Sequence, residues 1–189
     1  MFSPQLVIMG STRVMHSCAL GSTSKFALGH AKCPVMIVTG KTHIPSTRPS
    51  LGRSWIVLVD FRVIDSNGNE DLFKLFQGPD SIHFAHACGH STNLASACCD
   101  KLETLKELTT KRIQGCTASC GIVHVSSFHA TKSEIANKLC EVAAEGSYSA
   151  LCMGSRKHKL ISEKITGRVT KKIMKRTALP CVIIPSHHL

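Results

Sequence analysis

The chain is poor in aromatic side chains. They make up 5% of its 189 residues, with a single Trp and a single Tyr. A core with so few rings has to be aliphatic, which suits parallel strands that are buried on both faces. The same scarcity leaves few side chains on which nucleic-acid bases could stack, and no nucleic-acid-binding motif is present, so a nucleic-acid partner is not favoured.

Acidic residues are also scarce, at 12 in the whole chain. A metal-assisted phosphoryl-transfer site would be poorly supplied with carboxylate ligands, and no two carboxylates are spaced for acid–base catalysis. The Gly-x-Ser-x-Gly motif of serine hydrolases is missing too. We therefore predict a protein that is not an enzyme and has no metal site, with slow ATP hydrolysis left open.

The sequence has no apolar run of about 20 residues, so no membrane span is expected. No basic leader precedes the first apolar stretch, so no secretory signal is expected either. The chain has 10 cysteines, and many of them have aliphatic neighbours in predicted strands and helices, where a free Cys acts as a small hydrophobe. We expect reduced thiols and a cytoplasmic location.

Positive charge is in excess and is concentrated near the C-terminal end. The formal net charge is +11. Between residues 150 and 189, Glu163 is the one acidic residue among nine basic ones: Arg156, Lys157, Lys159, Lys164, Arg168, Lys171, Lys172, Lys175 and Arg176. Such a stripe attracts phosphate groups, on a nucleotide or on nucleic acid. The alternative interpretation is a solvated helix face.

Two segments carry nearly the same pattern about one domain length apart. Each has an apolar strand ending in Met-Gly-Ser, at Gly10 and at Gly154. Each then has a glycine that opens a predicted helix, Gly21 and Gly167, and each closes with an apolar strand next to a proline. A repeat of this length indicates a duplicated domain.

The repeat predicts the domain organisation. Residues 1–40 correspond to the C-terminal fragment of a first domain. Residues 41–53, rich in Gly, Pro, Ser and Thr, have the composition of a linker. Residues 54–189 then form a complete second domain.

Strands and helices alternate through this second domain. Strands are predicted at 55–59, 81–87, 118–125, 148–153 and 180–184, and helices at 71–76, 91–114, from Thr131 to about 143, and at 167–177. Thr131 and Glu134 have the spacing of a capping box. The alternation predicts an α/β fold, a three-layer α/β/α sandwich with a five-stranded, mostly parallel sheet. Asp60 and Gly154 follow its first and fourth strands and should share one ligand-binding edge.

The histidines of the second predicted strand suggest a metal site only at first sight. His83 and His86 are separated by an odd number of residues, so they point to opposite faces of a strand. Zinc needs four converging ligands. Structural or hydrogen-bonding roles are therefore expected for both.

The second copy resembles the universal stress protein family. The resemblance rests on Ile56-Val-Leu-Val-Asp60, Ile82-His-Phe-Ala-His-Ala87, Leu151-Cys-Met-Gly-Ser-Arg156, Gly167 and Pro180-Cys-Val-Ile-Ile184, and it covers about 54–185. The first copy matches as the last third of a domain. The resemblance implies an adenine nucleotide alpha hydrolase-like fold, and pairing of domains through their last strand. The strands at 182–184 and 35–38 should therefore pair, within the chain or across a homodimer.

Many members of this family bind ATP through glycines at fixed spacing followed by Ser or Thr, with an Asp at the end of the first strand. Here Gly154 and Gly167 keep the required spacing and Asp60 is in place, but Lys157 replaces the second glycine and Arg168 replaces the Ser or Thr. The resemblance implies ATP or AMP as ligand, with Mg²⁺ accompanying ATP. The implied nucleotide-binding residues are Asp60, Ala87, Met153, Gly154, Lys157, Gly167, Arg168, Val169 and Thr170.

Two functions follow from this pattern. The first is a stress-response module that binds an adenine nucleotide in a degenerate site and acts by regulated association. The second is a nucleotide-free interaction or scaffold module with the same fold. The first function requires the cations of Lys157 and Arg168 to contact the phosphates of the nucleotide. In the second function these two residues are ordinary surface residues.

Overall fold

The computed structural model describes residues 5–11, 20–42, 52–61, 70–89, 92–125, 131–155 and 167–185. Within these ranges the strands are β1 (Val7–Ser11), β2 (Val35–Thr39), β3 (Ser54–Leu58), β4 (Ser81–Gly89), β5 (Thr117–Val125), β6 (Ala150–Ser155) and β7 (Cys181–Pro185). The helices are α1 (Ser22–His30), α2 (Glu70–Phe73), α3 (Thr92–Arg112), α4 (Lys132–Glu145) and α5 (Arg168–Arg176).

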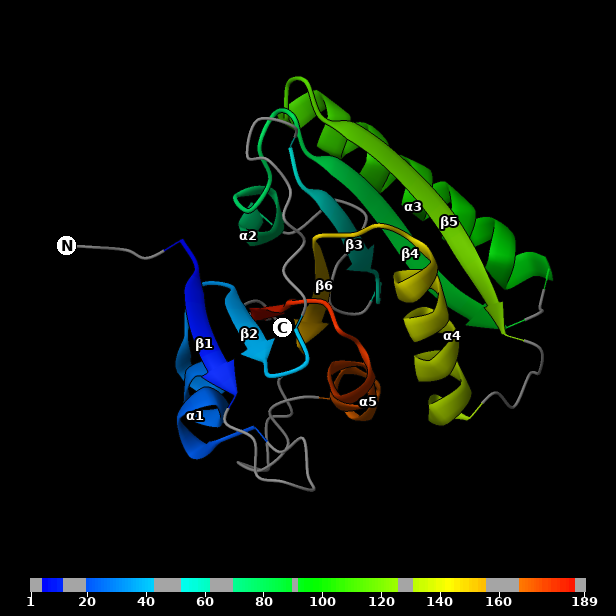
Figure 1. The fold of residues 1–189 in the computed structure, drawn as a ribbon. Coiled ribbons are helices and arrows are strands. Elements are labelled where there is room, and N and C mark those ends of the chain that lie inside the picture. The colour runs from blue at the N-terminus through cyan, green and yellow to red at the C-terminus, as the bar shows by residue number, and fades with distance from the viewer. Residues whose placement is uncertain are drawn as a thin grey trace.

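All of these strands join one sheet in the order β1-β2-β7-β6-β3-β4-β5 (Figure 1). The α/β class and the mostly parallel sheet are confirmed, but the sheet has seven strands and not five. The difference arises because β1 and β2 add to the edge that β7 would otherwise leave open. Every strand pair is parallel except β2 with β7, which is antiparallel.

The pairing of β2 with β7 is the expected contact between the two similar segments, and it occurs within the chain. Val35 lies opposite Ile183, and Ile37 lies opposite Cys181. All four side chains are buried. The edge of β7 is therefore already occupied in the monomer.

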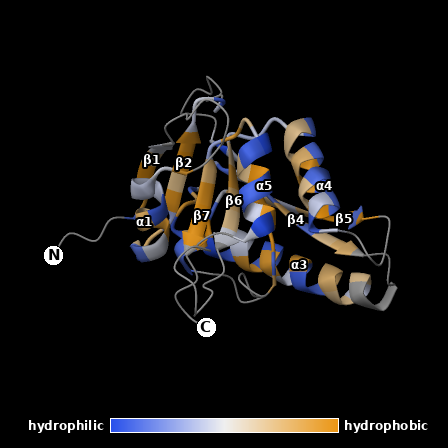
Figure 2. Ribbon diagram, turned by 90° about the horizontal axis from the view of Figure 1, so that it is seen from below, coloured by the Kyte–Doolittle hydropathy of each residue, from blue (hydrophilic) through white to orange (hydrophobic). Residues whose placement is uncertain are grey.

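Helices cover both faces of the sheet. α2 and α3 pack on one face, against Trp55, Val57 and Phe84, while α1, α4 and α5 pack on the other, against Ile56 and Leu58. Consecutive residues of β3 thus point to opposite helix layers, as expected of a strand buried on both sides. Figure 2 shows the hydrophobic colour along β2, β6 and β7 and a mixed pattern on α5. None of the helices in the described ranges has the length and hydrophobicity needed to span a bilayer.

The start of α4 confirms the predicted capping box. The Thr131 hydroxyl accepts a hydrogen bond from the Glu134 amide (3.4 Å), and the Glu134 carboxylate accepts one from the Thr131 amide. We expect Thr131→Ala to lower the free energy of unfolding by about 1 kcal/mol, because the backbone amide of Glu134 loses its side-chain acceptor. Urea unfolding followed by Trp fluorescence measures the loss. Thr110→Ala, on the exposed side of α3, is the control and should change stability by less than about 0.5 kcal/mol. Equal effects of the two variants would contradict this role.

The nine cysteines within the described ranges are free thiols. Cys152 and Cys181 lie on the neighbouring strands β6 and β7 and are almost completely buried. Burial raises the pKa of the Cys181 thiol to about 12, and it raises the pKa of Cys152 as well. These two thiols therefore stay protonated and contribute to the core as small apolar side chains.

Candidate functional site

The carboxyl ends of β3 and β6 bring Asp60 and Gly154 to the same edge of the sheet. The two strands are parallel neighbours, with Leu58 opposite Met153. Asp60 lies two residues beyond Leu58 and Gly154 one residue beyond Met153. The arrangement expected from the alternation of strands and helices is therefore observed, and the two residues do not lie at opposite ends of the sheet. We call this region the carboxyl-edge site.

The backbone beside Asp60 is held by the next strand. Val59 donates its amide to the Ala85 carbonyl (2.8 Å), and its own carbonyl is 2.8 Å from Nδ1 of His86. The His86 ring also lies 4.9 Å from the Phe61 ring, between ring centres. His86 therefore has the structural role expected from the sequence. It positions the segment on which Asp60 lies.

Three of the predicted site residues belong to one apolar cluster. Met153 is buried, while Ala87 and Val169 are half-buried and pack against the same group of side chains on the α4 and α5 face. They come from β4, β6 and the first turn of α5, so the fold brings together residues far apart in the sequence. A cluster of this kind can form the apolar wall of a ligand site.

The start of α5 provides backbone donors at the carboxyl edge. Because β6 and β7 are parallel, the helix that connects them has to begin at the edge where β6 ends. Gly167 is the residue that caps it, with φ −58° and ψ 158°, and no side chain among the described residues caps the first turn. The amides of that turn have no partner inside the helix, as at any helix start, and such amides can bind an anion. In the described part of the chain, a Cβ added to Gly167 would meet no atom within 4 Å.

The charge of α5 is positive along its whole length. Its basic residues are Arg168, Lys171, Lys172, Lys175 and Arg176, and it contains no acidic residue. Arg168 is exposed in the first turn, whereas the Lys172 ammonium donates to the Ser133 hydroxyl of α4 (2.5 Å). Thr170, two residues after Arg168, is buried. Lys157, the other predicted cation of the site, lies outside the described residues.

The first strand–helix–strand unit has the same geometry as the last. Gly21 caps α1 with φ −58° and ψ 161°, close to the values of Gly167. The Ser24 hydroxyl, three residues later, donates to the carbonyl of Gly10 at the end of β1 (3.4 Å). The start of the helix therefore lies directly against the strand-end glycine. Thr170 occupies the corresponding position in α5.

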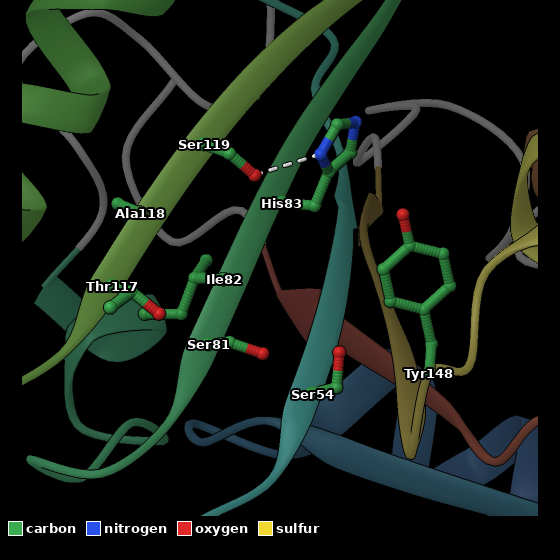
Figure 3. Close-up of a pocket in the computed structure, with 8 residues that line it drawn as sticks. All are labelled: Ser54, Ser81, Ile82, His83, Thr117, Ala118, Ser119 and Tyr148. Carbon is green, nitrogen blue, oxygen red and sulfur yellow. Dashed lines mark hydrogen bonds between the residues drawn. The ribbon is translucent and has the colours of Figure 1, made fainter.

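A feature that sequence analysis missed lies at the opposite, amino edge of the sheet. Ser54, Ser81 and Thr117 are the first residues of β3, β4 and β5, and they lie opposite one another in the sheet. With Tyr148 and other residues they line a pocket of about 190 Å³ (Figure 3). The signal was present in the sequence, since each of the three strands begins with a hydroxyl residue. It could be recognised only once the register of the strands was known.

Metal ligands do not converge in the described part of the chain. No group of three His, Cys, Asp or Glu side chains among these residues is placed to hold an ion. His83 and His86 point to opposite faces of β4, since His83 contacts Ser119 and His86 contacts the Val59 carbonyl.

The sequence matches the model of the universal stress protein family over residues 81–185, more than half of the chain. None of the curated proteins compared with the chain matches it significantly.

Solved structures show the same fold. A universal stress protein from Archaeoglobus fulgidus superposes with a TM-score of 0.61 at 19% identity, over 96% of this chain and 61% of that one. The hypothetical protein MJ0577 gives a TM-score of 0.56 at 13% identity, over 74% of this chain and 99% of that one. Protein PA1789 from Pseudomonas aeruginosa gives 0.54 at 11% identity, over 96% and 63%. The chain thus spans about three fifths of the length of two of these relatives.

Proposed function

The chain belongs to the universal stress protein family, and from that premise we propose that its carboxyl-edge site binds an adenine nucleotide, ATP or AMP. The nucleotide would regulate association of the protein with a partner in the stress response. The observation that carries the proposal is the first turn of α5. It begins at the edge where Asp60 and Gly154 lie, it is capped by a glycine that faces open space, and its side chains add only positive charge.

Two groups of residues would contact two different parts of the nucleotide. The amides after Gly167 and the guanidinium of Arg168 suit the phosphates, because helix N-termini and cations both favour negative charge. Ala87, Met153 and Val169 supply an apolar surface for the base and ribose. Asp60 would accept hydrogen bonds from the adenine end, and Lys157 would approach the phosphates, as the family resemblance implies. Mg²⁺ would enter with ATP, bound to its phosphates.

The proposed role is binding without catalysis. Among its described residues, the carboxyl-edge site provides one carboxylate, Asp60, and no His–Ser or His–Cys pair that could activate a nucleophile. A change in association on nucleotide binding is therefore the proposed output.

We also propose that residues 1–40 descend from a second copy of the domain. The support is the shared order of strand, helix and strand, and the matching glycine geometry at Gly21 and Gly167. In this chain the fragment would take the place of a partner domain on β7. A homodimer would then have to use a surface other than the β7 edge.

Titration calorimetry with ATP and AMP tests the nucleotide proposal. Gly167→Val should weaken binding by about ten- to a hundredfold, because the valine side chain takes the space in front of the α5 amides and removes charge-assisted hydrogen bonds. Folding should be unaffected, since the new Cβ has no neighbour within 4 Å. Asp60→Ala should weaken binding as well.

Gly10→Val is the matched control, because an added Cβ at Gly10 also meets nothing within 4 Å among the described residues, and because β2, β7 and β6 separate its strand β1 from β3. It should leave the affinity unchanged. No heat of binding at nucleotide concentrations of about 1 mM, the range of weak specific ligands, would contradict the proposal and favour a nucleotide-free scaffold module.

A further inference from the structure

Three adjacent strands begin with a row of hydroxyl groups on one face of the sheet. Ser54 lies opposite Ser81, and Ser81 lies opposite Thr117. Neighbouring strands are about 4.8 Å apart, so the three residues form a line across the sheet with that spacing. All three share the face on which α4 packs. Parallel sheets normally have apolar residues on a face that is covered by helices, so a row of three hydroxyl residues is unusual there.

A second row continues the polar surface one step along the strands. His83 lies opposite Ser119, and its Nδ1 is 2.9 Å from the Ser119 hydroxyl oxygen. The Tyr148 ring stands beside this pair, with its centre 6.1 Å from that of the His83 ring and tilted by 44°. Figure 3 shows the imidazole and the phenol ring standing on either side of β3, with the Ser119 hydroxyl beside the imidazole and Ser54, Ser81 and Thr117 lower in the view. Five hydroxyls and one imidazole thus line a single pocket.

The pocket suits a small ligand. Its volume of about 190 Å³ is smaller than the roughly 300–1,000 Å³ of pockets that bind drug-sized ligands. It lies at the amino edge of the sheet, whereas the carboxyl-edge site lies at the other end of the same strands. The two regions are therefore separate, and neither depends on the other.

The pocket carries no full charge at neutral pH. Among the described residues that line it there is no Lys, Arg, Asp or Glu. Burial lowers the pKa of His83, so its imidazole is neutral near pH 7. An anion or a cation would gain no counter-charge from these residues, whereas a neutral ligand needs none.

We propose that this pocket binds a small neutral polyhydroxyl compound of three to six carbons, such as a sugar alcohol or a monosaccharide. Serine, threonine and tyrosine hydroxyls each donate and accept, and neutral histidine does both through its two ring nitrogens. These groups are complementary to a ligand whose own hydroxyls also donate and accept hydrogen bonds. The Tyr148 ring provides an apolar wall against which the C–H face of such a ligand can lie.

The expected affinity is weak. A ligand of about ten non-hydrogen atoms in a shallow polar site is expected to bind with a Kd on the order of 1 mM. Tyr148 is the only tyrosine of the chain, so its ring signals in an NMR spectrum need no separate assignment. It is also part of the pocket wall, and it therefore reports directly on occupancy.

The test is an NMR titration of the full chain with xylitol as probe. The Tyr148 ring signals should shift and saturate. The double variant Ser81→Ala with Ser119→Ala should weaken binding by about tenfold or more, since two hydrogen-bonding groups are lost. The matched control is Thr104→Ala with Thr110→Ala, which removes two exposed hydroxyls from α3 that bond only to backbone carbonyls of their own helix. It should leave the Kd unchanged.

Three outcomes would overturn the proposal. One is the absence of saturation up to about 100 mM xylitol, roughly a hundred times the expected Kd. Another is equal binding by the Ser81/Ser119 double variant and the wild-type chain. The third is a response to inorganic phosphate in place of xylitol, which would show that the pocket takes an anion. Gly167→Val should not affect xylitol binding, so failure here is distinguishable from failure of the nucleotide proposal.

Discussion

Replacing Asp80 with alanine is expected to lower the free energy of unfolding by about 3–5 kcal/mol. The Asp80 side chain is 1% exposed and forms an ion pair with Arg53, whose guanidinium nitrogen Nη2 is 3.1 Å from Oδ2. Removing the carboxylate leaves the partners around it without an acceptor. Such losses are among the largest that a single substitution causes.

The carboxylate of Asp80 accepts hydrogen bonds from three residues. It accepts from the amide of Arg53 (2.8 Å), from the amide of Gln77 (3.0 Å) and from the indole N–H of Trp55 (2.9 Å), in addition to the guanidinium. Trp55 is 2% exposed. Its indole N–H would be buried without a partner in the alanine variant, which costs more than an ordinary lost hydrogen bond.

Chemical denaturation followed by fluorescence measures this effect well, because Trp55 is the only tryptophan and lies in the network. Asp80→Asn keeps one oxygen acceptor and should lose less stability than Asp80→Ala. Glu141→Ala, which removes the exposed ion pair with Lys138 on α4, is the control and should lose less than about 1 kcal/mol. A loss of that size for Asp80→Ala would contradict a central role of the network.

The same network predicts an acid-dependent loss of stability. Burial opposes ionisation of Asp80, but hydrogen bonds from Arg53, Gln77 and Trp55 outweigh it and lower the pKa. The unfolded pKa is about 3.9. The contribution of Asp80 is therefore fully present above that pH and is lost as the pH falls through the lower, folded pKa. In that acid range, stability should fall less steeply in Asp80→Asn than in the wild-type chain.

Gly52→Ala is expected to cost on the order of 3 kcal/mol. Gly52 has φ +75°, a left-handed conformation that disfavours any side chain. A Cβ built there would lie 1.9 Å from the Pro79 carbonyl oxygen and 2.5 Å from the Pro79 carbonyl carbon. Both obstacles are backbone atoms, so the loop before β3 or the turn before β4 would have to move.

The stability losses of Gly52→Ala and Gly10→Ala are compared through their denaturation midpoints. Gly10 does not have a positive φ and has open space at its Cβ, so that variant should change stability by less than about 1 kcal/mol. Gly52 precedes Arg53, which donates to Asp80. The losses of Gly52→Ala and Asp80→Asn should therefore be less than additive in the double variant. Full additivity would mean that the two features are independent.

Much of the fold follows from local patterns in the sequence. The long helix predicted at 91–114 is α3, and the capping box at Thr131 starts α4 as expected. Nothing in the local pattern around Gly78-Pro79-Asp80 indicates that the central network of the amino edge forms there. Both of these predictions depended on residues within a few positions of one another, where periodicity and capping chemistry act.

The shared position of Asp60 and Gly154 could also be predicted, because alternating strands and helices force parallel strands to end at one edge. Lys157 lies outside the described residues, so its part in the site stays a prediction. Pairing of the strands at 35–38 and 182–184 was expected from the family resemblance. Whether it occurs within one chain or between two depends on the path of the connecting chain, which no local pattern encodes.

The sequence by itself determined the alternation of elements, the aliphatic core, the glycines before α1 and α5 and the excess of cations. Only the tertiary structure decided that the sheet has seven strands, that Asp80 collects its donors from Arg53, Trp55 and Gln77, and that the first residues of β3, β4 and β5 align in one polar row. The physical reason is that these features depend on strand register. Register fixes which residues far apart in the sequence become neighbours, and it is set by packing of the whole sheet.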